Sequence, residues 1–323
     1  MKQIDVTALG ELLIDFTENG LSKQGNPMLE ANPGGAPCNV LAMLGKLGKK
    51  TAFIGKVGRD SFGDMLASTL EEVGIATDGL KRDEKVHTTL AFVHTKPGGD
   101  REFSFYREPG ADMMLTEADV ENDLIDNCRI FHFGTLSMTH AGCREATMKA
   151  VLRAKAGGKI VTFDPNLREP LWNTLDEAKE QILWGMSQCD VLKISDNEIV
   201  WLTGEADYDD GAAWIRKRFP NIALLLVSMG PDGSRAYYRD LRVEVKPFLR
   251  PDTIETTGAG DTFCACVLNA VLENGLDSLN EDDLRSMLTF ANAAASIVTT
   301  RKGALRVMPE KEEVLALIHA EGR

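Results

Sequence analysis

Several features that define other classes of protein are missing from this sequence of 323 residues. The formal net charge is −13, so the chain lacks the basic excess or basic patch that a nucleic-acid-binding protein normally carries. No apolar run approaches the roughly 20 residues of a membrane-spanning helix. We therefore expect no nucleic-acid or membrane partner, whereas an anionic substrate held by a few local arginines remains compatible with the acidity.

Signals of secretion and of metal binding are also missing. The segment MKQIDVTALG lacks the apolar region of a signal peptide. The six cysteines include no CxxC pair, and the five histidines show no metal-ligand spacing. Cys264 and Cys266 fall within an apolar run, so we expect them to be small buried residues. These features predict a reduced, cytoplasmic setting.

Neither common nucleotide-binding fingerprint occurs. The string closest to G-x-x-x-x-G-K-[ST] is GKLGKKT (45–51), and its glycine spacing is wrong. No G-x-G-x-x-G follows a strand and opens a helix. A phosphate site would have to come from another segment, and the best candidate is Gly258-Ala259-Gly260 at the start of a predicted helix.

What the chain does contain is an alternation of short apolar segments with helical patterns. Strands are predicted at 4–10, 51–58, 129–135, 159–166, 190–195 and 222–228, and helices at 39–48, 61–73, 140–157, 176–187, 261–274, 281–299 and 310–319. This order predicts a doubly wound α/β fold with a mostly parallel sheet and helices on both faces. No repeat, low-complexity tract or long linker appears, so residues 1–323 are expected to form a single domain.

One segment breaks the alternation. Residues 88–108 read as two strands joined by a Pro-Gly-Gly-Asp turn, with no helix between them. They are therefore expected to be antiparallel neighbours, forming either an extra edge of the main sheet or a small lid beside it.

Polar residues follow several of the predicted strands. In open α/β sheets, ligands gather at the carboxyl ends of the strands, so these positions are candidates for a binding site. Any one of them is as well explained as a helix cap or loop residue, but their shared location favours a site. They are Asp15, Asp164, Asn166, Arg168, Ser195, Glu198, Ser228 and Gly230.

The segment ETTGAGDTF (255–263) places Asp261 directly after two glycines and before an apolar run. The simpler interpretation is a glycine turn followed by an N-cap. Alternatively, backbone N–H groups at 258–261 would stabilise a phosphoryl group in transfer, because glycines allow a close approach. Asp261 would then accept the proton of the attacking hydroxyl.

Two motifs carry a resemblance to a known family. TTGAGDTF (256–263) resembles the C-terminal signature of the ribokinase-type sugar kinases, the PfkB family, and PGGAPCNVLAMLGKLG (33–48) resembles the N-terminal signature. The resemblance extends over essentially the whole chain. It implies a ribokinase-like doubly wound sheet with a small β lid, here expected from parts of about 11–33 and 88–112.

The resemblance also implies roles for individual residues. Asp261 would be the catalytic base, with Gly258, Ala259 and Gly260 as the anion hole. Glu198 matches the acid of the N-x-x-E motif that holds magnesium through water, although Ser195 stands where the motif has Asn. The sugar-binding positions implied are Asp15, Gly34, Gly35, Asn39, Phe105, Arg107 and Arg168, and the nucleotide-binding positions are Ser228, Gly230 and Asn292.

Structural explanations remain open for several of these residues. Gly34 and Gly35 could form only a turn, and Asp15 and Arg168 could be surface residues. Phe105 and its neighbour Tyr106 should point to opposite faces of a strand, so only one of them should touch a ligand.

The implied cofactors are ATP and Mg²⁺. Many members of the family also bind a monovalent cation such as K⁺ beside the anion hole. The usual acid at that site is Asp, and here it is Glu255, so K⁺ binding stays open. A homodimer formed through the lid is a further expectation, because an isolated two-stranded apolar element is marginally stable.

Within the family, four segments resemble the fructokinases most: GELLIDF, GDREFSFYREPGADMML, FHFGTLS and DPNLREPLW. The expected reaction converts ATP and D-fructose to fructose 6-phosphate and ADP. A 2-keto-3-deoxygluconate kinase is the alternative, because Arg107 and Arg168 together would hold its carboxylate. A non-catalytic sugar-binding relative is the alternative of another class.

Overall fold

The computed structural model describes residues 3–95 and 101–322, and the larger of its two sheets orders the described strands as β13-β12-β11-β10-β9-β8-β1-β4-β5. From β5 to β11 all neighbouring strands are parallel, while β12 and β13 run antiparallel at one edge. The strands are β1 (Ile4–Leu9), β4 (Thr51–Gly58), β5 (Ile75–Asp83), β8 (Cys128–Phe133), β9 (Ile160–Phe163), β10 (Val191–Ser195), β11 (Leu224–Ser228), β12 (Ser234–Tyr238) and β13 (Leu241–Val245).

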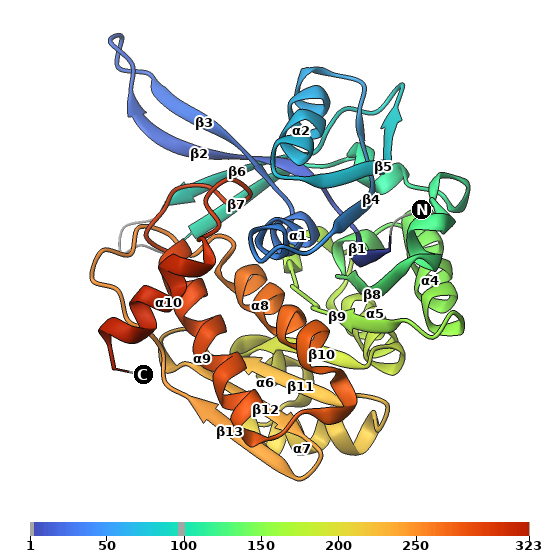
Figure 1. The fold of residues 1–323 in the computed structure, drawn as a ribbon. Helices are drawn as coiled ribbons and strands as arrows, with labels where there is room; N and C mark the ends of the chain where they lie inside the picture. Colours follow the sequence, from blue (N-terminus) through green and yellow to red (C-terminus); the bar gives the residue numbers. More distant parts are fainter. Residues whose placement is uncertain (1–2, 96–100, 323) are drawn as a thin grey trace.

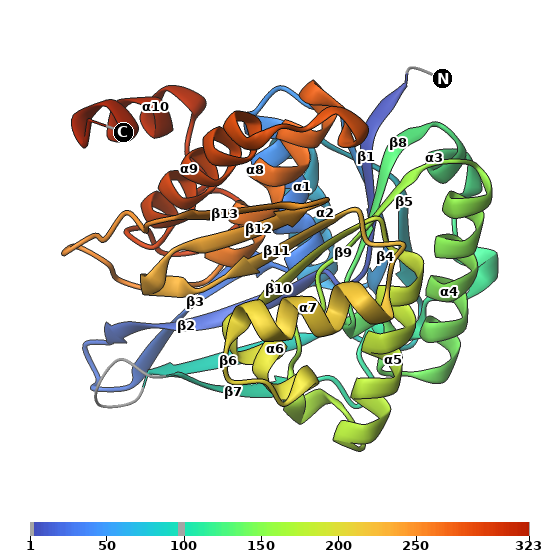
Figure 2. The same cartoon turned by 90° about the horizontal axis from the view of Figure 1, so that it is seen from below.

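Helices cover both faces of this sheet (Figure 2). One face packs against α1 (Ala36–Lys46), α2 (Ser61–Glu72), α8 (Ala259–Asn274) and α9 (Glu281–Val298), with α10 (Lys311–Ala320) outside α9. The other face carries α3 (Asn122–Asp126), α4 (Ala141–Ala156), α5 (Leu175–Gln188), α6 (Asp196–Thr203) and α7 (Tyr208–Arg218). Two separate apolar cores result, one on each side, and the predicted doubly wound fold is confirmed.

A second, four-stranded sheet stands beside the main body in the order β3-β2-β6-β7 (Figure 1). Its strands are β2 (Leu13–Leu21), β3 (Pro27–Gly34), β6 (Leu90–Thr95) and β7 (Arg101–Tyr106). The predicted antiparallel pair is confirmed, since Leu90 pairs with Tyr106 and Phe92 with Ser104. The expected turn at 97–100 lies outside the described residues. We call this small sheet the lid; that the whole chain is one domain stays a prediction.

Some elements were not expected from the sequence. The strands β5, β12 and β13 and the helices α6 and α7 have no counterpart among the predicted segments. The first helix begins at Ala36 and not at 39, because Pro37 suits the first turn, where a backbone N–H has no helical partner.

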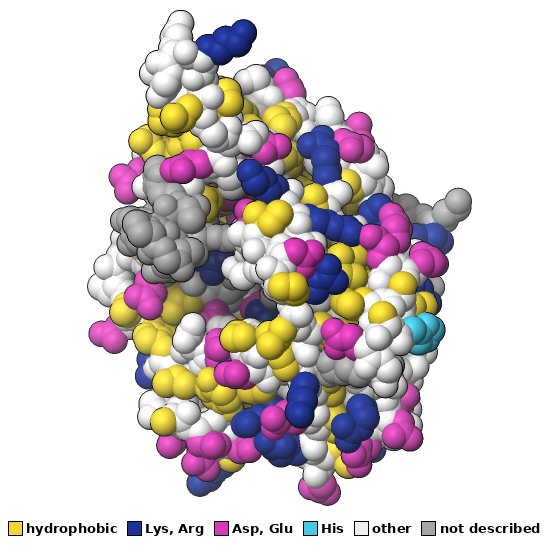
Figure 3. Space-filling model, turned by 90° about the vertical axis from the view of Figure 1, so that its left-hand side faces the viewer, with side chains coloured by type: hydrophobic (Ala, Val, Ile, Leu, Met, Phe, Trp, Pro, Cys, Tyr) yellow, Lys and Arg dark blue, Asp and Glu magenta, His cyan; other side chains and the backbone are white. Residues whose placement is uncertain are grey.

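Other sequence expectations concern the setting. Among the described residues, no helix is both long enough and apolar enough to cross a membrane. All six cysteines are free and buried, including Cys264 and Cys266. On the face seen in Figure 3, Lys and Arg side chains are interspersed with Asp and Glu.

Candidate active site

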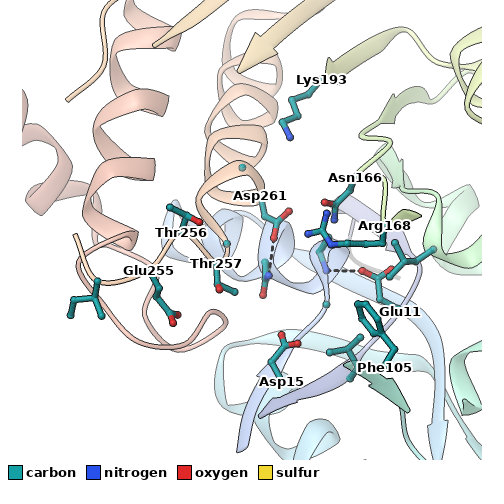
Figure 4. Close-up of a pocket in the computed structure, with 18 of the residues that line it drawn as sticks. Glu11, Asp15, Phe105, Asn166, Arg168, Lys193, Glu255, Thr256, Thr257 and Asp261 are labelled. Atoms are coloured by element: carbon teal, nitrogen blue, oxygen red, sulfur yellow. Dashed lines mark hydrogen bonds between the residues drawn. The ribbon is translucent and has the colours of Figure 1, made fainter. Parts of the chain in front are cut away.

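A cavity of about 660 Å³ opens where the carboxyl ends of the central parallel strands face the lid and the start of α8. Figure 4 shows how its side chains converge from segments far apart in the sequence. Of the residues predicted for the site, this cavity is lined by Asp15, Gly35, Asn39, Phe105, Arg168, Gly258, Gly260 and Asp261. Of the strand-end residues named from the sequence, Asp15, Asn166 and Arg168 line this cavity, and Ser195, Glu198, Ser228 and Gly230 line two cavities that share residues with it.

Asp261 lies in the first turn of α8 and points into the cavity (Figure 4). Asn39, on α1, donates a hydrogen bond from Nδ2 to Asp261 Oδ2 at 2.8 Å, across 222 positions of sequence. Burial raises the pKa of Asp261, while the Asn39 hydrogen bond and the charges of Lys193 and Arg168 oppose that rise. The result is a desolvated carboxylate held in one orientation, which suits proton acceptance.

The backbone before Asp261 forms a helix start open to the cavity. Gly258 is the N-cap with φ of 76°, a left-handed conformation that favours glycine. The Ala259 N–H donates to the Thr256 carbonyl at 3.2 Å, so one of the N–H groups in this turn is already engaged. Gly260 and Asp261 follow in the same first turn, where backbone N–H groups lack an acceptor within the helix. This end of α8 favours an anion.

The glycine turn at 34–35 connects the lid to α1. Gly35 has φ of 129°, and a Cβ there would lie 2.4 Å from the Glu11 carbonyl oxygen. A Cβ on Gly34 would lie 2.5 Å from Asp15 Oδ2, so the Asp15 carboxylate rests directly against this turn. Gly34 itself does not line the cavity; it makes room for Asp15, which does.

Glu11 is a residue that sequence reasoning missed. Its Oε1 accepts a hydrogen bond from the Ala36 backbone N–H at 2.8 Å, at the first residue of α1. Burial raises the pKa of Glu11 to about 7. Because α1 carries Asn39, the bond to Ala36 helps to fix the partner of Asp261. The available signal was a carboxylate inside the apolar segment TALGELLI, where an unpaired charge is costly.

On the lid, Phe105 lines the cavity, and Tyr106 is 67% exposed. The Tyr106 ring packs edge-on against Phe92 on the neighbouring strand, with ring centroids 5.1 Å apart. The alternation expected for a strand therefore puts Phe105, and not Tyr106, at the cavity wall.

The two arginines proposed for substrate binding differ sharply. Arg168 lines the cavity beside Asn166, and Figure 4 shows both side chains next to Asp261. Arg107 does not line it: its guanidinium is buried and forms an ion pair with Asp112 at 2.7 Å. The structure thus gives Arg107 an internal partner instead of a place at the first cavity.

Lys193 is the second residue missed from the sequence. It stands in the buried strand β10, and its Nζ lies 3.0 Å from Asp164 Oδ2. Burial raises the pKa of Asp164 to about 7, although the charge of Lys193 opposes this rise. For Lys193, burial alone would lower the pKa, but the charge of Asp164 holds the pKa of Lys193 above its ordinary value. A lysine inside the apolar run DVLKIS was the visible signal, since buried lysines need a partner.

A second cavity of about 460 Å³ adjoins the first and shares Lys193, Thr253, Thr256 and Gly260 with it. All three residues predicted for the nucleotide, Ser228, Gly230 and Asn292, line this cavity, as does Ala259. Asn292 also donates from Nδ2 to the carbonyls of Val245 and Lys246, each at 3.2 Å, so it braces the cavity wall.

Glu198 lines a third cavity of about 300 Å³ together with Arg168 and Lys193. Its carboxylate accepts from the Leu167 N–H at 2.7 Å and from the Ser195 N–H and hydroxyl at 2.8 and 2.7 Å. A carboxylate offers about four acceptor positions. One acceptor position of Glu198 thus remains. It is enough to hold Mg²⁺ through a water molecule but not to surround the ion with protein ligands, which we call a cage. No group of three or more His, Cys, Asp or Glu side chains in the described ranges forms such a cage.

Glu255 also lines the first cavity, beside the start of α8. Its Oε1 accepts a hydrogen bond from the Gly303 N–H at 3.0 Å, which joins the loop before α8 to the loop after α9. The acid at the predicted monovalent-cation position is therefore engaged in bracing two loops.

All three cavities are thus lined by Lys193, the first two are also lined by the start of α8, and the Asp261 carboxylate lies at the first. This arrangement suits the transfer of an anionic group from a ligand in one cavity to a ligand in the next. The pfkB family carbohydrate kinase profile matches residues 3–311. The chain belongs to the pfkB family of carbohydrate kinases, and it is a kinase of ribokinase-like fold.

Several of its relatives are fructokinases. The chain is 45% identical to probable fructokinase-6, chloroplastic, of Arabidopsis thaliana, over 96% of this chain and 81% of the relative. Fructokinase with bound ATP from Xylella fastidiosa superposes with a TM-score of 0.89 at 32% identity, covering 99% of each chain. A double mutant of fructokinase from Vibrio cholerae O395, in fructose, ADP and potassium ion bound form, superposes with a TM-score of 0.87 at 26% identity, covering 98% of this chain and 99% of that one.

Proposed function

We propose that this chain is an ATP-dependent fructokinase, which converts D-fructose and ATP to fructose 6-phosphate and ADP. The observation that carries the proposal is the position of Asp261, half-buried and held by Asn39 where the first cavity adjoins the second. The names of the relatives favour fructose as the sugar.

In the proposed reaction, Asp261 removes the proton of the sugar hydroxyl as its oxygen attacks the γ-phosphorus. The bond from that phosphorus to the bridging oxygen breaks, and ADP leaves with the electron pair. The backbone at 258–261 and the ammonium of Lys193 stabilise the negative charge of the group in transfer. Magnesium would neutralise phosphate charge when bound, and Glu198 would hold it through water.

The remaining positions divide between the two substrates. Asp15 would accept hydrogen bonds from sugar hydroxyls, and Phe105 would cover the apolar face of the sugar. Gly35, Asn39 and Arg168 complete the sugar-binding set, with Gly34 supporting Asp15. Ser228, Gly230 and Asn292 would contact the nucleotide.

The 2-keto-3-deoxygluconate alternative is weaker than the sequence suggested. That interpretation used Arg107 and Arg168 together, but Arg107 is already paired with Asp112. In the first cavity a substrate carboxylate would meet one arginine, Arg168, and three acidic side chains, Glu11, Asp15 and Asp261. The non-catalytic alternative is disfavoured because Asp261 and its supporting hydrogen bond are intact.

The experiment is a sugar panel with ATP, in which fructose and 2-keto-3-deoxygluconate are the decisive substrates and ADP release is measured. We expect fructose to give the higher kcat/KM, and Asp261→Asn to lower kcat by about 10²–10⁴ while the protein stays folded. A higher kcat/KM for the keto acid would replace fructokinase by the alternative. Near-normal turnover by Asp261→Asn would remove the proposed base, and no turnover with any sugar would favour the non-catalytic relative.

Three further expectations belong to this proposal. A monovalent cation such as K⁺ would bind near Glu255, as suggested by the potassium-bound relative. A homodimer would form through the lid, which leaves Leu21, Met28, Leu29 and Tyr106 exposed. The cytoplasmic location stays a prediction from sequence.

A further inference from the structure

The base of the lid contains a buried ion pair outside the three cavities described above. Arg107 directly follows β7, and Asp112 belongs to the short 3-10 helix Ala111–Met114. Arg107 Nε donates to Asp112 Oδ2 at 2.8 Å, and Nη2 lies 2.7 Å from the same oxygen. The two side chains are only 3% and 2% exposed, so water does little to solvate either charge.

Additional hydrogen bonds hold the Arg107 and Asp112 side chains in place. Arg107 Nη1 donates to Thr139 Oγ1 at 2.8 Å, and Nη2 donates to the Leu136 carbonyl at 2.9 Å. The Thr89 hydroxyl, directly before β6, donates to Asp112 Oδ1. Although burial alone would lower the pKa of Arg107, the charge of Asp112 and its hydrogen bond hold that pKa above its ordinary value.

Arg107 stands immediately behind the wall of the first cavity. Leu136, whose carbonyl accepts from Arg107, lines that cavity. Phe105 lines it as well, and it also lines a neighbouring cavity of about 480 Å³ to which Arg107 and Thr139 contribute. The guanidinium is therefore close to the sugar site, but its charge is balanced by Asp112.

We propose that Asp112 is a specificity-determining residue: by neutralising Arg107 it keeps the sugar site selective for uncharged sugars and against sugar acids. This inference rests on the proposed function, since it concerns the substrate of the same site. It also assigns Arg107 a positioning role at the lid base, in place of substrate contact.

The expected selectivity against sugar acids has an electrostatic reason. A bound sugar acid needs a cation near its carboxylate. Arg107 is paired with Asp112 and Lys193 with Asp164, and the charge of Arg168, which also lines the cavity, acts on Asp261. Removing the charge of Asp112 leaves a buried arginine without its counterion, which is strongly unfavourable until another anion approaches. A substrate carboxylate would be such an anion.

The decisive variant is Asp112→Asn, which keeps the shape of the side chain and an acceptor for Thr89. Its kcat/KM is measured with fructose and with 2-keto-3-deoxygluconate. We expect the preference for fructose over the keto acid to fall by at least about tenfold relative to wild type, chiefly through the KM for the acid. Glu281→Gln, which breaks an exposed pair with Arg285 on α9, is the control and should leave the preference at the wild-type value.

A second measurement does not depend on activity. Asp112→Ala leaves space for a small carboxylate, so acetate should raise the Tm of this variant more than the Tm of wild type, because it binds the folded state. The double variant Arg107→Gln with Asp112→Asn should show neither the acetate effect nor the gain for the keto acid. This measurement decides the question where Asp112→Asn fails to fold.

An unchanged preference in folded Asp112→Asn, or equal acetate effects in Asp112→Ala and wild type, would overturn the inference. An equal rise of kcat/KM for the keto acid in Asp112→Asn and in the double variant would also overturn the inference, because the rise would not require Arg107. Failure of wild type to phosphorylate fructose is a different result, which would contradict the proposed function itself.

Discussion

At the scale of single residues, the site depends on carboxylates whose burial alters their proton affinity. Asp261, Asp164 and Glu11 all have pKa values raised by burial, and each has a specific polar partner. Asp261 was predictable because it stands within a long, distinctive motif. Glu11 and Lys193 were harder to predict, because their partners Ala36 and Asp164 lie 25 and 29 positions away and meet them only in the fold.

Glu11 provides a prediction about pH and stability. Its pKa rises from an ordinary 4.5 to about 7 on folding, so between those values the folded protein binds more protons than the unfolded chain. The contribution of Glu11 protonation to the free energy of unfolding is therefore fully present below about pH 4.5 and is lost as the pH rises through 7. A shift of this size corresponds to about 3 kcal/mol.

Glu11→Gln removes this titration while keeping an oxygen that can accept from Ala36. Relative to wild type, the variant should gain free energy of unfolding between pH 5 and pH 8. Urea unfolding at several pH values measures this difference. Glu312→Gln, at an exposed position of α10, should give a curve parallel to wild type, and a parallel curve for Glu11→Gln would contradict the assignment.

At the scale of elements, strongly periodic segments were predicted well and context-dependent ones were not. The parallel strands β1, β4, β8, β9, β10 and β11 are continuous apolar runs, because helices bury both of their faces. The strands β2 and β3 show little alternation of apolar and polar residues and become exposed toward their shared hairpin end. From the sequence they could therefore be predicted only as parts of a lid. Their pairing depends on partners elsewhere in the chain.

The turn between β3 and α1 gives a prediction at this scale. In Gly35→Ala the new Cβ would clash with the Glu11 carbonyl at 2.4 Å, at a φ of 129° that L-residues avoid. The start of α1 must then shift, and Asn39 moves with it. We expect kcat/KM for fructose to fall by about 10²-fold, the scale of a misplacement of about 1 Å.

Gly48→Ala is the matched control at the other end of α1. Gly48 also has a positive φ, 77°, but a Cβ there meets nothing within 4 Å. Gly48→Ala should lower the free energy of unfolding by about 1–2 kcal/mol and leave kcat/KM for fructose nearly unchanged. Similar kinetic losses in both variants would show that backbone strain, and not the position of α1, is responsible.

At the scale of the whole molecule, the β2–β3 hairpin projects beyond the body (Figure 1). Hydrophobic side chains are visible on this projecting part in Figure 3. Met28 and Leu29 are consecutive strand residues and so face opposite sides, yet they are 44% and 42% exposed. The body therefore covers neither side of the hairpin here, and an exposed two-sided apolar element is unfavourable in an isolated chain.

A second copy of the chain would cover this surface, because a two-fold arrangement places the same patch on both partners. We predict that the wild-type protein sediments as a dimer and that Leu21→Glu combined with Leu29→Glu sediments as a monomer, since each charge would be desolvated in the interface. Leu152→Glu, at a 50% exposed position of α4 away from the lid, is the control and should stay dimeric. Sedimentation velocity over a range of protein concentrations tests this prediction. A wild-type monomer at every concentration, or a dimer that survives both lid charges, would show that the lid does not form the interface.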